Sequence, residues 1–262
     1  MEVTFFGVRG SIPVSGEAFA AYGGHTSSYE VLCDDIQIII DTGSGFQNIK
    51  LREDIPVLIL FSHFHHDHIQ GFTFNSSVFS HQKNIFLSSA LCAPDQLRDT
   101  LRTYFSGGYF PVDAVNMLSH LCFVEFNKIS EIVNAAIEIE SITLNHPGGC
   151  VGYSFTSGNK KFSYLQDNEF EDSQNASLGT FIENSDLVVW DGMFTEAELP
   201  ERAGWGHSSL EQGVAFAKDH ELRRLAISHH APFRTDAMIK NFEDEYGTDQ
   251  IIMARENQRI IL

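Results

Sequence analysis

The chain has 262 residues, 43% of them hydrophobic, which is enough to bury a sizeable core, and we predict one domain over residues 1–262. Its 17 Lys and Arg residues against 35 Asp and Glu residues give a formal net charge of −18. This balance argues against a long nucleic acid as partner, because such binding depends on cations that neutralise phosphates. No stretch approaches the ~18 uninterrupted apolar residues of a membrane span, and the N-terminus resembles no secretory signal, so we expect a cytoplasmic protein without membrane contact.

Short runs of apolar or alternating residues recur along the chain and predict β-strands, because they are rich in β-branched and aromatic residues and end near Gly, Asn or Asp. The predicted strands cover residues 3–8, 28–33, 36–41, 57–62, 84–89, 121–126, 136–144, 152–157, 161–166, 186–191 and 223–228. Helices are predicted after several of these strands. We therefore expect an α/β protein with two sheets covered by helices on the outside.

Helical periodicity predicts three helices, over residues 94–105, 208–220 and 235–247. Ser208 and Glu211 have the spacing of a capping box, and Thr235 or Asp236 is the expected N-cap of the last helix. Residues 72–120 contain an additional stretch rich in aromatic residues, Gly and Ser. We predict that this segment forms a lid or a pocket wall, with a packed satellite cluster as the alternative.

A dense group of histidines follows the predicted strand at 57–62, in the segment FSHFHHDHIQG at residues 61–71. Its candidate metal ligands are His63, His65, Asp67 and His68. Imidazole and carboxylate together suit zinc, or manganese or iron, better than calcium. Without a metal, so many buried polar groups would each need separate hydrogen-bond partners, which makes a purely structural cluster the weaker interpretation.

One loop cannot complete the coordination of two ions, and three further candidates lie elsewhere in the chain. His146, Asp167 and His229 each follow a predicted strand. Taken singly, each is as readily a capped or surface residue. Their shared position at strand ends is what a site built on the edge of a sheet requires.

These segments together resemble the metallo-β-lactamase superfamily, whose His-x-His-x-Asp-His signature matches HFHHDH at residues 63–68. The resemblance extends over nearly the whole chain, through FFGVRGSIP at 5–13, IIIDTGSG at 38–45, His146, Asp167, GWGHSSLEQ at 204–212 and ISHHAP at 227–232. It implies a four-layer αββα sandwich with a two-metal site at the exposed edges of its sheets.

Within the superfamily, the N-terminal glycine loop and the GHSSLEQ segment are similar to the phosphodiesterase branch, typified by tRNase Z and cyclic phosphodiesterases. The resemblance implies a first metal on His63, His65 and His146, and a second on Asp67, His68 and His229. Asp167 is then expected to bridge both ions. His207 is expected to face the phosphate from outside the metal shell.

Two departures weigh against tRNA processing. In tRNase Z a His-Glu-Ala-Thr segment precedes the last motif, whereas this chain has Trp190 where that histidine would fall. The long basic arm that grips tRNA also has no counterpart, because Arg202 is the one basic residue between Asp167 and His207. The acidic net charge agrees with both observations.

The expected cofactors are two divalent ions, zinc in the first place, with manganese or iron as alternatives. Ions ~3.5–4 Å apart can hold a bridging hydroxide that attacks phosphorus. Asp67 is expected to accept the proton of the nucleophile. His207 is expected to stabilise the transition state or to protonate the leaving oxygen, the alternative being that it caps the helix at 208–220.

Four residues near these motifs have open roles. Arg9 either meets a substrate phosphate or lies on the surface, and His25 is placed near the site only by the resemblance. For Asp191 and Glu211 simple capping or exposure is the favoured interpretation, and orientation of His207 is the alternative. Structural or surface roles are expected for the remaining histidines, His66, His81, His120, His220 and His230.

The leading hypothesis is a binuclear metal-dependent phosphodiesterase that acts on a small substrate, such as a cyclic nucleotide. The alternative is a tRNA 3′-processing endonuclease. More distant alternatives are a hydrolase of carbonyl esters, lactams or thioesters, and a non-catalytic metal-binding module, since one fold hosts unrelated functions. A homodimer is expected from the resemblance alone.

Overall fold

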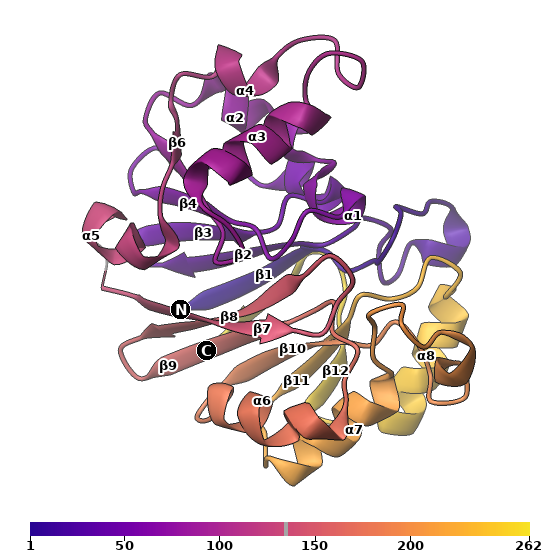
Figure 1. The fold of residues 1–262 in the computed structure, drawn as a ribbon. Coiled ribbons are helices and arrows are strands. Elements are labelled where there is room, and N and C mark those ends of the chain that lie inside the picture. Colours follow the sequence, from indigo (N-terminus) through magenta and orange to yellow (C-terminus); the bar gives the residue numbers. More distant parts are fainter. Residues whose placement is uncertain (134–135) are drawn as a thin grey trace.

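The computed structural model describes residues 1–133 and 136–262. Two β-sheets pack face to face, and helices cover the outer face of each (Figure 1). The order of layers is helix, sheet, sheet, helix, as predicted. The first half of the chain builds most of one sheet with its helices, and the second half builds the other sheet and adds the last strand of the chain to the first.

The first sheet has seven strands in the order β13-β1-β2-β3-β4-β5-β6. Their bounds are Gln258–Ile261 (β13), Glu2–Gly7 (β1), Ser28–Cys33 (β2), Ile36–Ile40 (β3), Val57–Leu60 (β4), Ile85–Ser88 (β5) and Leu121–Phe123 (β6). Strands β3 to β6 run parallel, and the others pair antiparallel. Strand β4 reads VLIL and is buried throughout, as a parallel strand covered on both faces should be.

The second sheet has six strands in the order β12-β11-β10-β9-β8-β7. Their bounds are Ile251–Met253 (β12), Leu225–Ser228 (β11), Leu187–Asp191 (β10), Lys160–Leu165 (β9), Cys150–Ser157 (β8) and Glu138–Leu144 (β7). Strands β9 to β12 are parallel, so their carboxyl ends meet at one edge of the sheet. Strands β7, β8 and β9 form an antiparallel meander.

The helices fall into two groups. The first group is α1 (His66–Ile69), α2 (Ser76–Ser80), α3 (Pro94–Tyr104), α4 (Ala114–Met117) and α5 (Ile129–Val133). The second is α6 (Asn175–Phe181), α7 (Leu210–Asp219) and α8 (Asp236–Tyr246). The described residues also form six short 3-10 helices: Glu17–Phe19 (η1), Ser44–Asn48 (η2), Phe72–Phe74 (η3), Phe126–Lys128 (η4), Asp172–Gln174 (η5) and Leu199–Glu201 (η6). Helices α2, α3 and α4 lie outside the first sheet, and α6, α7 and α8 lie outside the second (Figure 1).

The inner faces of the two sheets form the largest core. It includes Ile38 and Leu58 from the first sheet and Tyr153, Phe162 and Val189 from the second, all completely buried. Burying a side chain of this size stabilises the fold by roughly 1.5–3 kcal/mol. This packing holds the edges of the sheets in register, and those edges carry the predicted metal ligands.

The eleven predicted strands are confirmed, with ends that differ by up to three residues. The largest difference is at β6, which is shorter than predicted because the chain turns into η4 at Phe126. The sequence-based assignment missed β12 and β13, whose three and four residues show no clear alternation. Helices α3, α7 and α8 are confirmed, whereas the shorter ones are too brief for their periodicity to be recognised.

The predicted capping box of α7 is wrong by one residue. The hydroxyl of Ser209, rather than that of Ser208, accepts the backbone N–H of Gln212. In return, Oε1 of Gln212 accepts the backbone N–H of Ser209. Ser208 instead donates its hydroxyl to the carbonyl of Asn168, in the loop that follows β9. At α8 the cap is Thr235, one of the two predicted candidates.

Residues 72–120 contain β5 and also cover the first sheet. Phe72, Leu97 and Leu101 are buried against that sheet, while other aromatic side chains of the segment line a pocket beside α1. Its role as a lid stays a prediction. Among the helices of the described residues, none has the length and apolar character to cross a membrane.

Candidate metal centre

The seven predicted ligands gather where the edges of the two sheets meet. Four of them belong to the loop after β4 and to α1, which is the first helix after that strand. Of the other three, His146 follows β7, Asp167 follows β9 and His229 follows β11. The sandwich therefore brings together residues that are up to 166 positions apart in the sequence.

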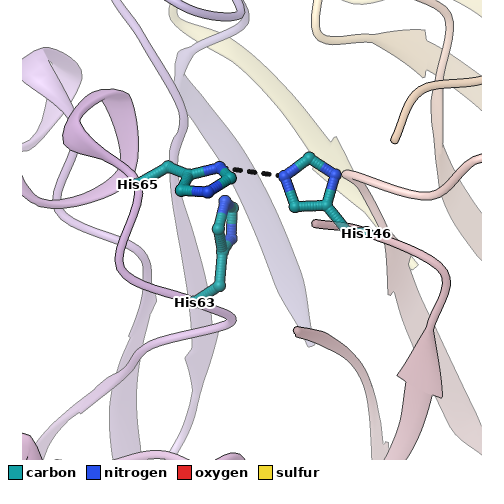
Figure 2. A group of neighbouring side chains, drawn as sticks. All are labelled: His63, His65 and His146. Carbon is teal, nitrogen blue, oxygen red and sulfur yellow. Dashed lines mark hydrogen bonds between the residues drawn. The ribbon is translucent and has the colours of Figure 1, made fainter. Parts of the chain in front are cut away.

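One half of the site consists of three histidines, shown in Figure 2. Nε2 of His146 lies 2.9 Å from Nδ1 of His65. The centroid of the His63 ring is 4.6 Å from that of the His65 ring and 4.9 Å from that of the His146 ring. One ring nitrogen of each lies within 4.8 Å of the others. His63 and His146 are buried, whereas His65 is exposed, so this half opens to solvent on the side of the His65 loop.

The other half consists of Asp67, His68 and His229, all buried. Oδ2 of Asp67 lies 3.4 Å from Nε2 of His68 and 3.9 Å from Nε2 of His229. The N-terminal loop covers this half, because the backbone N–H of Ser11 donates to Oδ2 of Asp67 at 2.8 Å. The loop approaches so closely that a Cβ at Gly10 would lie 2.5 Å from the His229 ring.

Asp167 lies between the two halves. Its Oδ2 is 3.0 Å from Nε2 of His68, and its Oδ1 is 3.3 Å from Nε2 of His229. The same Oδ1 is 3.7 Å from Nε2 of His146 and 3.9 Å from Nε2 of His63. Asp167 and His229 both have a φ of 59°, a left-handed conformation that costs about 1–3 kcal/mol and is typical of functional sites.

The outward nitrogens of the buried rings are held by fixed partners. Nδ1 of His68 pairs with Oδ2 of Asp41 at 2.8 Å, and Nδ1 of His146 donates to the carbonyl of Gly206 at 2.7 Å. Nδ1 of His63 lies 3.1 Å from Oγ of Ser62, and Nδ1 of His229 lies 3.2 Å from Oγ of Ser27. These bonds fix the ring orientations and leave Nε2 facing the centre, as the outer partners of metal-binding histidines do.

Asp41 is a residue beside the cluster that the sequence analysis did not single out. Besides His68, its carboxylate accepts the N–H and hydroxyl of Ser62 and the hydroxyl of Tyr164, at 2.7–2.9 Å. It follows β3 in the IIIDTGSG segment and has a φ of 58°. A carboxylate directly after a buried strand was a usable signal, but only the fold shows that it faces His68.

The atoms at the centre fit divalent cations. Nε2 of His63, His68 and His229 and Oδ2 of Asp167 are buried and have no hydrogen-bond partner among the described residues. The close contact between His68 and Asp167 lacks the geometry of a hydrogen bond. Leaving such groups unpaired costs about 1–3 kcal/mol each, which metal coordination would remove. Imidazoles with carboxylates are the donors that zinc, manganese and iron bind.

The charges in the cluster favour the forms that bind metal. Burial, helped by the charge of His68, holds the pKa of His63 well below its usual value, and burial also lowers the pKa of His65 and His229. Burial raises the pKa of Asp167, but the histidines around it lower it well below the usual value. His68 is the exception: burial lowers its pKa, and three carboxylates, Asp167 foremost, raise it well above normal. A bound cation would take the place of that proton.

His207 stands beside the centre and is held by Asp191. Its Nδ1 lies 2.8 Å from Oδ2 of Asp191, and its ring stacks on His229 with the centroids 5.1 Å apart. Burial lowers the pKa of His207, but Asp191 raises it more, to about 9. The His207 side chain is 11% exposed. His207 also lies close enough to His146 and Asp167 for these three residues to form a further group that could hold a metal ion. Because Nδ1, which faces Asp167, is already bonded to Asp191, a place outside the metal shell fits His207 better.

Two expectations about this region are wrong. His207 does not cap α7, because Ser209 does. Asp191 is neither a cap nor exposed: it is 1% exposed and positions the His207 ring. Glu211 does fit the favoured interpretation of simple capping or exposure, because its carboxylate accepts the backbone N–H of Glu196.

Both interpretations of Arg9 are also wrong. The side chain is completely buried, and its guanidinium donates to the carbonyls of Gly23 at 2.7 Å and Arg234 at 2.6 Å. Arg9 therefore fastens the N-terminal loop to the C-terminal part of the chain and is not exposed to a substrate. His25, in the same loop, lies with Nδ1 3.1 Å from Oγ of Ser44 and belongs to none of the metal-binding groups found in the described residues.

The remaining histidines lie outside the cluster. His81, His120 and His230 bond to backbone carbonyls, and His220 bonds to Asn175. His66 is exposed on α1. In the pair after β11, His229 faces the centre and His230 bonds to the carbonyl of Ala254 at 3.0 Å, which agrees with the predicted choice of the first.

Comparisons with known proteins bear on this geometry. A family described as "Beta-lactamase superfamily domain" matches residues 37–230. Over 236 residues the chain is 25% identical to the "Probable metallo-hydrolase YhfI" of Bacillus subtilis, which covers 87% of this chain and 86% of that protein. Over 285 residues it is 23% identical to the "Ribonuclease Z" of Clostridium acetobutylicum, with 88% of each chain covered.

Solved structures share the fold. The crystal structure of Bacillus subtilis YhfI has a TM-score of 0.74 at 18% identity, covering 99% of this chain and 98% of that one. A diphosphatase from the PhnP family has a TM-score of 0.69 at 16% identity, covering 100% and 97%. The four-layer sandwich is therefore that of the metallo-β-lactamase fold.

Proposed function

We propose, from the premise that this chain belongs to the β-lactamase superfamily and is a metal-dependent hydrolase, that its substrate is a small phosphodiester, such as a cyclic nucleotide. The observation that carries the proposal is one arrangement of side chains. Two groups of nitrogen and oxygen donors share Asp167, and a histidine held by a buried carboxylate stands beside them. Such a centre suits a substrate that develops negative charge at a central atom.

The proposed cofactors are two divalent ions, zinc in the first place. One would be held by His63, His65 and His146, the other by Asp67, His68 and His229, and both by Asp167. Ions bound there would polarise the phosphate oxygens and activate water for attack on phosphorus. The chain supplies the remaining elements of the mechanism.

Asp67 is proposed to combine two roles. Its Oδ2 is fixed by the N–H of Ser11, so the carboxylate keeps one orientation relative to His68 and His229. The pKa of Asp67 lies below the usual value, because His68 outweighs the effect of burial. The group is therefore an anion that can bind a cation, and its proposed part in accepting the proton of the attacking water rests on its position in the centre and not on its basicity.

His207 is proposed to act on the phosphate. Its Nδ1 is engaged with Asp191, which leaves Nε2 as the nitrogen that can donate to a phosphate oxygen or to the leaving group. Asp191 fixes the ring and supplies the negative charge that favours the protonated form. A donor set in place before the reaction stabilises charge that develops in the transition state.

Phosphate chemistry is supported over carbonyl chemistry by the relatives. The relative from Clostridium acetobutylicum is named a ribonuclease, and one solved structure with this fold is titled a diphosphatase. Both names describe proteins that cleave phosphate linkages. The glycine loop and the GHSSLEQ segment, which are similar to the phosphodiesterase branch, point the same way.

The ribonuclease relatives also favour a second candidate, a tRNA 3′-processing endonuclease. The net charge of −18 counts against it. Arg202, the one basic residue between Asp167 and His207, is paired with Glu201 and lies over the Trp205 ring at 5.0 Å. A small substrate therefore remains our proposal, and a homodimer and a cytoplasmic location remain predictions.

A panel of substrates tests this proposal. The metal-loaded protein is expected to hydrolyse bis-p-nitrophenyl phosphate and at least one cyclic nucleotide, because the charged centre stabilises a phosphorane-like transition state. A β-lactam, a thioester and a precursor tRNA, assayed beside them, are expected to react far more slowly. Absence of diester turnover with zinc, manganese and iron would refute the proposal, and faster cleavage of precursor tRNA would select the second candidate.

A further inference from the structure

A pocket of about 450 Å³ lies beside α1, the helix that also carries Asp67 and His68 of the metal centre. Its walls come from α1, from the end of α3 and from the loop that follows α3. Phe105 and Ile69 are buried at its base. Phe74 and Tyr109 are 66% and 81% exposed. Large aromatic side chains left open to water around one pocket indicate a binding site.

The aromatic rings of this pocket are already arranged around a space. Phe110 makes edge-to-face contacts with Phe74 at 6.1 Å and with Phe105 at 5.8 Å between centroids. The His66 ring is 6.3 Å from the Tyr104 ring. Because these contacts hold the rings in place, an incoming planar group meets preformed π faces at little entropic cost.

The polar groups of the pocket suit a neutral ligand with hydrogen-bonding edges. They are the Gln70 amide, the His66 imidazole and the tyrosine hydroxyls, and no Asp, Glu, Lys or Arg is among the described lining residues. Gln70 is anchored, since its Nε2 donates to Oγ1 of Thr26 at 3.0 Å. A phosphate would find no cation here, and a purely apolar group would leave these polar atoms without partners.

Helix α1 connects this pocket to the metal centre. His66, Ile69 and Gln70 line the pocket, whereas Asp67 and His68 point to the centre. Residues that line the pocket and residues of the metal centre thus interleave along one short helix.

We propose that this pocket binds the base of a nucleotide substrate while the phosphodiester lies at the metal centre. The inference rests on the proposed function and narrows it to nucleotide diesters. Stacking on Phe74, Tyr104 and Tyr109 accounts for affinity, and Gln70 and His66 supply partners for the edges of the base. The volume, the neutral lining and the helix α1 shared with the metal centre together favour a base over other occupants.

The first test measures binding without catalysis. Adenosine is titrated against the metal-free protein, followed by ligand-observed NMR, with Phe74→Ala and Tyr109→Ala as pocket variants. Both side chains are exposed, so truncation should leave the fold intact. Each variant is expected to weaken adenosine binding about tenfold, because stacking on one aromatic ring contributes that much. Phe79→Ala and Met117→Ala remove exposed apolar side chains of neighbouring helices outside the pocket and are expected to change nothing.

The second test uses two substrates with the same reacting group. Adenosine 2′,3′-cyclic phosphate and glycerol 1,2-cyclic phosphate both carry a five-membered cyclic diester, and only the first has a base. The pocket variants are expected to raise KM about tenfold for the first and to leave kcat/KM for the second unchanged. Equal losses on both substrates would overturn the inference.

The outcomes separate this inference from the proposed function. Adenosine binding that depends on Phe74 and Tyr109, with no diester turned over, would support the pocket and refute the diesterase. Turnover of diesters with no adenosine binding, or with binding that ignores both variants, would overturn the pocket alone. If sedimentation shows that the variants separate a dimer, a second copy of the chain covers this face, which also overturns it.

Discussion

Replacing Asp167 by asparagine is expected to lower kcat/KM for a phosphodiester by at least about 10³-fold and to reduce the bound metal below two ions per chain. Asp167 contacts both halves of the centre, with carboxylate oxygens 3.0–3.9 Å from four imidazole nitrogens. Asparagine keeps the shape but removes the charge, and a loss of several kcal/mol of charge stabilisation corresponds to this factor.

The measurements are steady-state kinetics and elemental analysis of the purified variant. Asp172→Asn is the matched control, since Asp172 is an exposed carboxylate in η5, outside the cluster. A thermal melt shows whether each variant is folded. An Asp167→Asn protein that keeps two ions and wild-type turnover would refute the bridging role.

Replacing His207 by alanine is expected to lower kcat by about 10²–10³-fold while the metal content stays at its wild-type level. The size is that of losing one preorganised donor to the charge of a transition state. His207→Ala leaves the proposed metal ligands in place. Asp191→Asn should act through the same ring and give a smaller loss of kcat, because Nδ1 keeps a hydrogen-bond partner but loses its counter-charge.

His120→Gln serves as the control, since His120 bonds to the carbonyl of Val78 outside the centre. Unchanged turnover in His207→Ala would eliminate the phosphate role. Loss of metal in that variant would instead make His207 a ligand, through the further group that it forms with His146 and Asp167.

Much of the clustering at the site was predictable from the sequence because its proposed ligands follow strands. The motif HFHHDH places four metal-binding side chains within six consecutive residues. His146, Asp167 and His229 each follow a strand that the pattern of apolar residues predicts. In a sandwich whose parallel strands end at one edge, such residues meet. Long-range convergence could thus be inferred without any contact being known.

The partners behind the ligands could not be predicted in this way. Asp41 and Asp191 also follow or end buried strands, but their carboxylates are identified only by the rings that they hold, His68 and His207. Arg9 shows the opposite error. An arginine in a glycine loop suggests phosphate binding, whereas here backbone carbonyls from two distant segments surround it.

Predictions of local structure were wrong where neighbouring residues had the same hydrogen-bonding groups. Ser208 and Ser209 are adjacent hydroxyls, and the choice between them depends on Asn168, whose carbonyl takes the first and leaves the second to cap α7. Helix α1 has four residues, too few for a periodic pattern, although it positions both Asp67 and His68.

The stoichiometry of bound metal tests the central claim most directly. Because the two proposed half-sites share Asp167, zinc titrated into the metal-free protein should bind at about two ions per chain, measured by elemental analysis after removal of free metal. Two ions per chain in the wild-type protein is the predicted result. One ion or none, in a folded protein, would contradict the account.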